Sequence, residues 1–232
     1  MVIDYTLYLV TDRSVMSSKH LTEAVEQAIL GGCTMVQLRE KDISFVDFCK
    51  LALEVKQVTD NYHIPLIIND RIDIAMAIKA DGVHIGQHDI HASIARKMIG
   101  NDMLLGVSAA STEEAIQAMK DGADYLGIGA MFPTVTKTDA KLVSLEELQN
   151  IRSEVSLPIV VIGGINKENA GIFKNIGVDG LAVISAIIAQ PDIKKAALEL
   201  KTLFCGKEIG PKAASALCWE GSGCGRIAVK QP

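Results

Sequence analysis

The sequence contains few aromatic residues and no stretch of concentrated positive charge. Aromatic residues make up 4% of the chain, and its formal net charge is -5. A nucleic-acid-binding surface needs clustered cations and commonly uses aromatic rings to stack bases, so the composition indicates no nucleic acid as a partner. Any phosphate ligand would have to be met by a few local cations.

A long hydrophobic run and a basic leader are also missing. The N-terminal residues include Asp4 rather than a basic region, and the apolar run that follows is too short for a signal peptide or a membrane span. With 49% apolar and 22% charged residues, the composition is that of a soluble globular protein with a large core. We therefore expect a cytoplasmic protein that does not bind membranes.

Cysteines are present in an odd number and without paired spacing. The five residues are Cys33, Cys49, Cys205, Cys218 and Cys224. This pattern argues against a disulfide framework and fits a reducing compartment. Three of the cysteines lie near the C-terminus, but a zinc site there is disfavoured because that segment has neither a histidine nor a fourth cysteine.

Eight short apolar runs, each followed by a turn or a polar cluster, are the most informative feature that is present. They cover residues 8–10, 35–38, 66–68, 83–85, 103–107, 125–131, 159–162 and 180–184. Short apolar runs bounded by turn signals are typical of strands buried on both faces, as in a parallel sheet.

Segments with helical apolar spacing alternate with these runs. They cover residues 21–30, 45–58, 72–78, 94–99, 113–119, 145–151, 169–176 and 193–203. The expected N-caps are Thr22, Ser44, Ser111 or Thr112, Ser144 and Asn166, and glycines at 31–32, 122 and 177 are expected to end helices.

Strand and helix alternating eight times predict a single-domain (β/α)8 TIM barrel over residues 1–204. A doubly wound open sheet is the alternative, but it would not explain polar clusters at nearly every strand end. Residues 205–232 are rich in Gly, Ala, Ser and Lys and have no regular period. We expect them to form a C-terminal extension that is unpacked or unnatural in origin.

Two carboxylates follow neighbouring strands, Asp70 after the third run and Asp89 after the fourth. In this fold the loops after the strands form the active site. Two carboxylates, a few waters and a bound phosphate are a common way to hold Mg²⁺. Each aspartate alone could simply cap the next helix, but the pair favours a magnesium site.

Positively charged side chains are predicted at the same end of the barrel. Arg39 and Lys41 are two residues apart after the second run, so both point the same way if the chain stays extended. Lys137, in the long sixth loop, could close over the same anion. Arginine suits bidentate phosphate contacts and lysine a point-charge contact, so metal carboxylates beside three cations indicate a diphosphate site.

A second anion site is indicated after the last two strands. Gly163 and Gly164 follow the seventh run, and Ser185 follows the eighth. TIM barrels often bind phosphate at this place, through backbone N–H groups rather than basic side chains. Two anion sites, one of them with a metal, imply an enzyme that joins a diphosphate ester to a phosphorylated acceptor and expels pyrophosphate.

Six motifs in register then resemble one family, the thiamine-phosphate synthases, from about residue 8 to residue 204. They are QLREKD at 37–42, INDR at 68–71, DGVHIGQ at 81–87, GVS at 106–108, FPTVTK at 132–137 and IGGI at 162–165. The set is specific, although no single motif would be. The resemblance implies synthesis of thiamine phosphate from a pyrimidine diphosphate and a thiazole phosphate, with Mg²⁺ and no protein nucleophile.

The resemblance also implies a role for individual residues. Catalytic roles are implied for Arg39, Lys41, Ser108 and Lys137. The implied contacts of the pyrimidine diphosphate are Gln37, Leu38, Arg39, Glu40, Lys41, Asn69, Ser108 and Lys137. Those of the thiazole phosphate are Thr134, Val135, Thr136, Gly164, Ile184 and Ser185, and Mg²⁺ is held by Asp70 and Asp89.

Related thiazole tautomerases are the nearest alternative function. The tautomerases use a histidine in the loop after GVS, where this chain has Ala109-Ala110-Ser111, and Ala110 cannot act as an acid or base. Two more functions fit a phosphate-binding barrel: a catalytically silent paralogue that binds thiazole phosphate, and an aldolase or isomerase that uses Lys41. The intact set of Asp70, Asp89, Arg39 and Lys41 favours the synthase.

Two further expectations concern the site's surroundings. We interpret His84 as a structural residue. The loop at 135–139 is expected to close on substrate, which would protect it from proteolysis when both substrates are bound. Association into a homo-oligomer is left open by the sequence.

Overall fold

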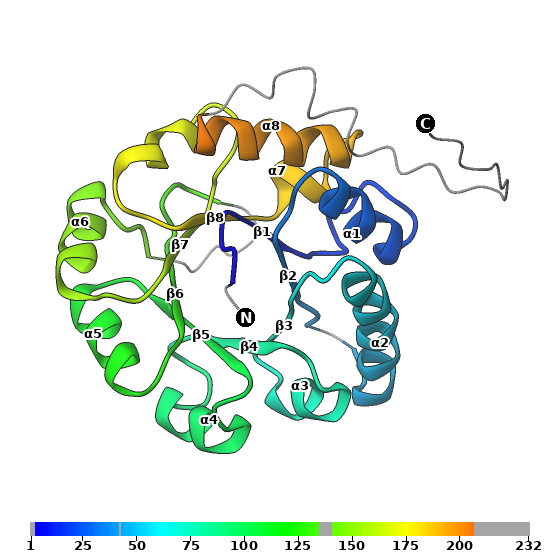
Figure 1. The fold of residues 1–232 in the computed structure, drawn as a ribbon, viewed down its shortest axis with the longest axis horizontal. Coiled ribbons are helices and arrows are strands. Elements are labelled where there is room, and N and C mark those ends of the chain that lie inside the picture. The colour runs from blue at the N-terminus through cyan, green and yellow to red at the C-terminus, as the bar shows by residue number, and fades with distance from the viewer. Residues whose placement is uncertain (1–2, 42, 135–140, 207–232) are drawn as a thin grey trace, which may run out of the picture.

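The structure is a computed structural model that describes residues 3–41, 43–134 and 141–206. Within these residues eight parallel strands form a closed barrel in sequence order, and helices surround it (Figure 1). The strands are β1 (Leu7–Val10), β2 (Met35–Leu38), β3 (Leu66–Asn69), β4 (Gly82–Ile85), β5 (Leu104–Ala109), β6 (Tyr125–Ile128), β7 (Ile159–Ile162) and β8 (Gly180–Val183). The predicted (β/α)8 barrel is confirmed.

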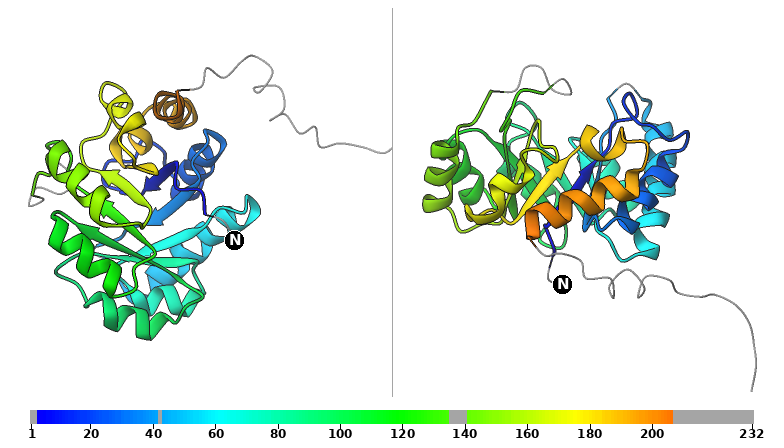
Figure 2. Two further views of the ribbon diagram at one scale, coloured as in Figure 1. Left: turned by 60° about the vertical axis from the view of Figure 1, so that its left-hand side comes forward. Right: turned by 90° about the horizontal axis from the view of Figure 1, so that it is seen from above.

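Helices fill the connections between strands. They are α1 (Leu21–Leu30), α2 (Phe45–Asn61), α3 (Ile72–Ile78), α4 (Ala92–Ile99), α5 (Thr112–Lys120), α6 (Leu145–Glu154), the 3₁₀-helix η1 (Ala170–Asn175), α7 (Ser185–Ile188) and α8 (Ile193–Cys205). Two further views of the ribbon show the helices on the outside of the strands (Figure 2). Within the described residues no helix is long and apolar enough to cross a membrane.

Several predicted boundaries are wrong. The strand expected over 125–131 ends at Ile128, because Ala130 leaves the sheet to bond the carbonyl of Lys141 at 3.0 Å. The segment 169–176 forms a 3₁₀-helix rather than an α-helix, and α7 was not predicted. The extension expected over 205–232 lies outside the described residues from 207 onward, as do Cys218 and Cys224 with the disfavoured zinc site.

Helix starts were predicted in part. The side chains of Ser44, Ser111 and Ser144 each accept a hydrogen bond from the backbone N–H three residues later, as expected of N-caps. Thr22 is not a cap, because α1 already begins at Leu21. Asn166 accepts from the N–H of Glu168 at 2.9 Å, but η1 begins only at Ala170.

Alternation along the strands separates two apolar layers. Residues such as Leu7, Leu9 and Val36 pack outward against the helices, while Tyr8, Met35 and Tyr125 fill the inside of the barrel. Because side chains in a strand alternate in direction, the inward set continues towards the carboxyl ends of the strands, where the barrel opens.

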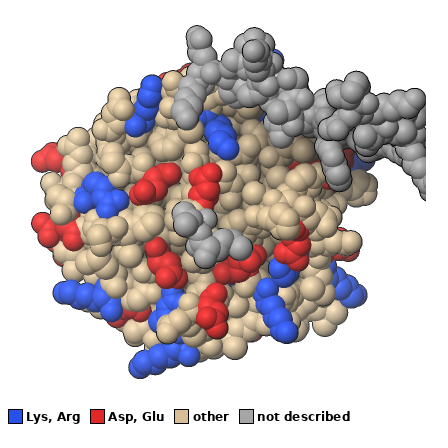
Figure 3. Space-filling model, viewed as in Figure 1, with Lys and Arg blue, Asp and Glu red and all other residues tan. Residues whose placement is uncertain are grey.

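The opposite end of the barrel is tied by a repeated contact. Asp81, Asp124 and Asp179 come directly before β4, β6 and β8, and each accepts a hydrogen bond from the N–H of the first or second residue of the preceding strand, at 2.7–2.9 Å. On this face acidic side chains gather around the barrel axis (Figure 3). Carboxylates here satisfy strand ends, so functional groups are expected at the other end.

Candidate active site

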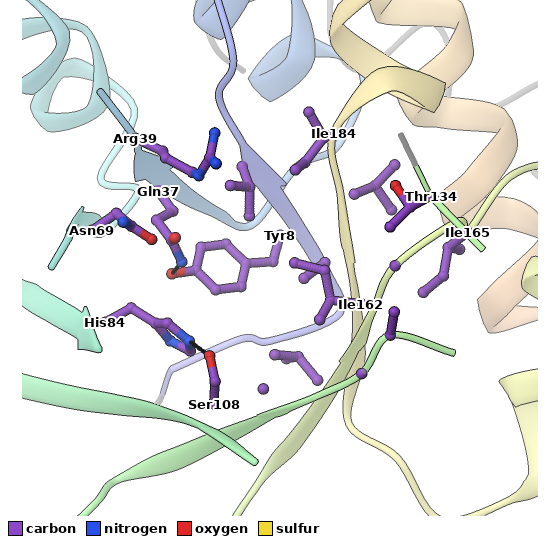
Figure 4. A pocket seen from close by; sticks show the side chains of 18 of the residues that line it. Tyr8, Gln37, Arg39, Asn69, His84, Ser108, Thr134, Ile162, Ile165 and Ile184 are labelled. Atoms are coloured by element: carbon purple, nitrogen blue, oxygen red, sulfur yellow. Dashed lines mark hydrogen bonds between the residues drawn. The ribbon is translucent and has the colours of Figure 1, made fainter. Parts of the chain in front are cut away.

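A cavity of about 440 Å³ opens at the carboxyl ends of the strands. Figure 4 shows its side chains converging from β1, β2, β3, β4 and β5 on one side and from the segments after β6, β7 and β8 on the other. The predicted site residues that line it are Gln37, Arg39, Lys41, Asn69, Asp70, Asp89, Ser108, Thr134, Gly164, Ile184 and Ser185. The fold thus brings both predicted anion sites into one cavity.

Two residues of the predicted pyrimidine set do not line the cavity. Gln37 in β2 and Arg39 and Lys41 just after it line the cavity, and with this period of two the side chains between them face away. Leu38 is fully buried in the outer core layer. The Glu40 carboxylate instead accepts from the Arg13 guanidinium at 2.8 and 2.6 Å.

Three predicted site residues belong to a segment that the structure does not describe. Val135, Thr136 and Lys137 lie outside the described residues, and so does the segment expected to close on substrate. Thr134, the last described residue before it, lies in the cavity wall (Figure 4).

The two predicted metal ligands meet at the cavity mouth. The chain turns at Asp70, whose φ is 61°, and α3 begins two residues later. Partial burial, followed by the hydrogen bond and negative charge of Asp89, raises the pKa of Asp70 to about 6. Asp89 is held by the N–H of Gly86 at 2.7 Å. The carboxylates are therefore close enough to repel each other unless a proton or a cation lies between them.

Arg39 extends from β2 towards the same mouth. Its guanidinium lies 3.3 Å from the carboxylate of Asp12, and its side chain is only 14% exposed. The backbone N–H of Arg39 donates to the Thr11 hydroxyl at 3.1 Å. A guanidinium held on one side in this way is oriented in advance for an anion in the cavity.

Glycines form the opposite wall. Gly163 and Gly164 have φ of 97° and 64°, a region that other residues rarely adopt. A Cβ on Gly164 would lie 2.7 Å from both the Cβ of Phe132 and the carbonyl oxygen of Pro133. The side-chain amide of Asn169 donates to the Gly164 carbonyl at 3.0 Å and braces the turn. The backbone can thus approach a ligand more closely than any side chain would allow.

The cavity also contains residues for which the sequence predicted no ligand role. Tyr8 and His84 lie in its floor, and the Nε2 atom of His84 is 2.9 Å from the Ser108 hydroxyl (Figure 4). The remaining apolar wall includes Val160, Ile162 and Ala182. The sequence feature that could have identified these residues is the period of two within each strand, which assigns every second residue to the barrel interior.

Comparisons with known proteins agree with this geometry. A family model described as thiamine monophosphate synthase matches residues 7–187. The thiamine-phosphate synthase of Ruminiclostridium cellulolyticum is 63% identical over 205 residues, covering 88% of this chain and 98% of that protein. The Clostridium beijerinckii thiamine-phosphate synthase is 62% identical over 202 residues, 87% of this chain and 97% of that protein.

A solved structure is similar as well. The thiamine phosphate pyrophosphorylase from Pyrococcus furiosus superposes with a TM-score of 0.81 at 40% sequence identity, covering 87% of this chain and 96% of the other. Nearly the full length of each of these proteins is therefore matched by the described barrel.

Proposed function

The chain belongs to the thiamine monophosphate synthase family, and from this premise we infer that it is a thiamine-phosphate synthase. The reaction joins 4-amino-2-methyl-5-(diphosphooxymethyl)pyrimidine to 4-methyl-5-(2-phosphooxyethyl)thiazole and releases pyrophosphate. One observation carries this conclusion beyond the family: a single cavity has carboxylates and cations on one wall and a glycine turn on the other. Such a cavity can hold two phosphorylated substrates side by side.

We propose that the pyrimidine diphosphate binds along the wall formed by β2 to β5. Its diphosphate meets Arg39 and Lys41, and its ring lies against Gln37, Asn69 and Ser108. Lys137 is proposed to reach the same diphosphate from the sixth loop. Leu38 and Glu40 contribute the extended backbone that spaces the inward-facing residues, because their side chains point away from the cavity.

The thiazole phosphate is proposed to bind the opposite wall. Gly164, Ser185 and Thr134 offer backbone N–H and hydroxyl donors to its phosphate, and Ile184 lies against the ring. Val135 and Thr136 complete this predicted set. Support comes from the left-handed glycine turn, which exposes backbone rather than side chains to the cavity.

Asp70 and Asp89 fit a magnesium ion. Their carboxylates lie close together, and the pKa of Asp70 is raised first by burial and then by the hydrogen bond and negative charge of Asp89, a charge that a divalent cation would offset. Within the described residues no cluster of three or more His, Cys, Asp or Glu side chains could hold a metal. Two carboxylates completed by substrate oxygens and water suit Mg²⁺, which keeps several waters. When bound, Mg²⁺ supplies positive charge to the leaving pyrophosphate.

The two walls of the cavity assist different steps of the reaction. The C–O bond to the diphosphate breaks first, and both electrons leave with pyrophosphate, whose charge Arg39 and Lys41 stabilise. The remaining pyrimidinylmethyl cation is stabilised by its own amino group. The thiazole nitrogen, held in place from the opposite wall, supplies the electron pair of the new C–N bond. The protein contributes orientation and charge stabilisation and needs no nucleophile.

The glycine turn gives a selective test of the thiazole wall. Gly164→Ala is expected to raise the KM for thiazole phosphate at least about tenfold, because the new Cβ would push Phe132 and Pro133 apart. Gly171→Ala is the control, since a Cβ there meets nothing within 4 Å. Steady-state kinetics with each substrate varied would measure both, and an equal loss of affinity for the pyrimidine diphosphate would contradict the assignment.

Pyrophosphate release tests the function as a whole. We expect the purified protein to release pyrophosphate only when both substrates and Mg²⁺ are present. Chelation of Mg²⁺ should stop the release of pyrophosphate without unfolding the barrel. Circular dichroism would check that the fold is kept. Isomerisation of the thiazole phosphate without pyrophosphate release would instead identify a tautomerase, and binding without turnover would identify a silent paralogue.

We also expect a cytoplasmic enzyme, and sedimentation would measure whether it forms a homo-oligomer.

A further inference from the structure

A chain of hydrogen bonds crosses the inside of the barrel beneath the cavity. The Gln37 side-chain amide donates to the Tyr8 hydroxyl at 2.8 Å, and that hydroxyl lies 2.9 Å from the Tyr125 hydroxyl. Tyr125 in turn lies 3.1 Å from Nδ1 of His84, and Nε2 of His84 lies 2.9 Å from the Ser108 hydroxyl. The chain therefore connects Gln37 on β2 to Ser108 on β5, and Figure 4 shows these two side chains with Tyr8 and His84 between them.

Burial makes this chain rigid and keeps its phenols protonated. Tyr8 and Tyr125 are 1% and 0% exposed. Burial raises the pKa of both hydroxyls well above the ordinary value of tyrosine, so each carries one proton to donate. In a dry interior such groups strengthen one another, and breaking one link leaves a polar atom without a partner.

The chain can pass its protons in one direction or the other, and the tautomer of His84 decides between them. In one direction the Tyr8 hydroxyl, which accepts from Gln37, donates to Tyr125, and Tyr125 donates to Nδ1 of His84. His84 then carries its proton on Nε2 and donates it to Ser108. At the two ends, the Ser108 hydroxyl keeps its proton for the cavity, and the Gln37 amide oxygen is left as an acceptor.

Two glycines make room for this contact. A Cβ on Gly106 would lie 2.3 Å from the Tyr125 hydroxyl and 2.4 Å from Nδ1 of His84. A Cβ on Gly127 would lie 3.0 Å from Cε1 of His84. Glycine inside a buried strand weakens it and often marks a close approach. The glycines of β5 and β6 thus keep the space in which His84 joins Tyr125 and Ser108.

We propose that Tyr8, Tyr125 and His84 are positioning residues that make Gln37 a hydrogen-bond acceptor and Ser108 a donor towards the aminopyrimidine ring. The inference rests on the proposed function. An aminopyrimidine presents an amino N–H donor and ring nitrogen acceptors, so an acceptor at Gln37 and a donor at Ser108 complement its polar groups. When the amino group shares its electrons with the cation, its N–H becomes a stronger donor, so the acceptor at Gln37 binds the transition state more tightly than the substrate.

Tyr125→Phe tests the chain through a residue that does not line the cavity. We expect kcat/KM for the pyrimidine diphosphate to fall about tenfold, while the KM for thiazole phosphate stays unchanged. Tyr5→Phe is the matched control, because its ring lies 5.3 Å from that of Tyr125 but outside the hydrogen-bond chain. Equal kinetics for the two variants, or equal losses for both substrates, would overturn the proposal.

The tautomer of His84 is a second readout, which depends neither on activity nor on Tyr125→Phe. Nitrogen-15 NMR of the wild-type protein, with the signal assigned by its absence in His84→Gln, should show the proton on Nε2. A proton on Nδ1 would reverse the chain and overturn the proposal. Wild-type protein without pyrophosphate release would contradict the proposed function alone, because the tautomer is measured in the free protein.

Discussion

Asp89→Asn is expected to lower the rate of pyrophosphate release about 10³-fold or more. The substitution keeps the size of the side chain but removes one of the two negative charges that fit Mg²⁺ at the cavity mouth. Asp70→Asn should have a similar effect, because neither carboxylate can hold the ion alone. Initial rates at several Mg²⁺ concentrations would measure the loss, and the Mg²⁺ concentration for half-maximal rate should rise in both variants.

Asp73→Asn is the matched control for this pair. Asp73 lies on α3 close to Asp70 in sequence but pairs with Arg71 on the surface, at 2.8 and 2.6 Å. Its removal should leave the rate and the Mg²⁺ dependence unchanged. Full activity of Asp89→Asn at low Mg²⁺ would show that the carboxylate pair does not hold the ion.

Arg39→Ala is expected to lower kcat/KM for the pyrimidine diphosphate about 10²- to 10³-fold. The guanidinium is held by Asp12, the backbone of Arg39 is held by Thr11, and Arg39 lies in the cavity wall, so its charge is positioned before the leaving group develops its own. Arg39→Lys should restore only part of the rate, because an ammonium cannot make the same bidentate contact. The KM for thiazole phosphate should change little.

Lys50→Ala controls for the loss of one positive charge. Lys50 lies on α2, its side chain is 69% exposed, and it does not line the cavity. Its kinetic constants should equal those of the wild type. If Arg39→Ala instead raised the KM for thiazole phosphate and spared the pyrimidine diphosphate, the assignment of the two walls would have to be exchanged.

The fold was predictable because one physical signal recurs along the chain. Each buried strand needs a short apolar run, and each surrounding helix needs an apolar stripe, so the alternation is visible without any long-range information. The position of Asp70 and Asp89 followed directly, since the carboxyl ends of parallel strands meet at one end of the barrel. Local exceptions such as η1 and α7 depend on packing that periodicity does not report.

One predicted motif divides its side chains between the cavity and the outside. The segment QLREKD at 37–42 was expected to bind through Leu38 and Glu40 as well; their side chains face away from the cavity, and their part in binding stays a prediction. The contact between Tyr8 and Tyr125 joins residues 117 positions apart. No local pattern indicates such a pairing, because closure of the barrel alone brings β1 and β6 to face each other across its interior.

Identification of the product tests the central claim most directly. Purified protein given both substrates and Mg²⁺ should form thiamine phosphate and pyrophosphate in equal amounts, as measured by mass spectrometry and a coupled phosphate assay. Pyrophosphate without thiamine phosphate would indicate simple hydrolysis of the pyrimidine diphosphate. That result, or the absence of both products, would contradict a cavity that holds two phosphorylated substrates and joins them.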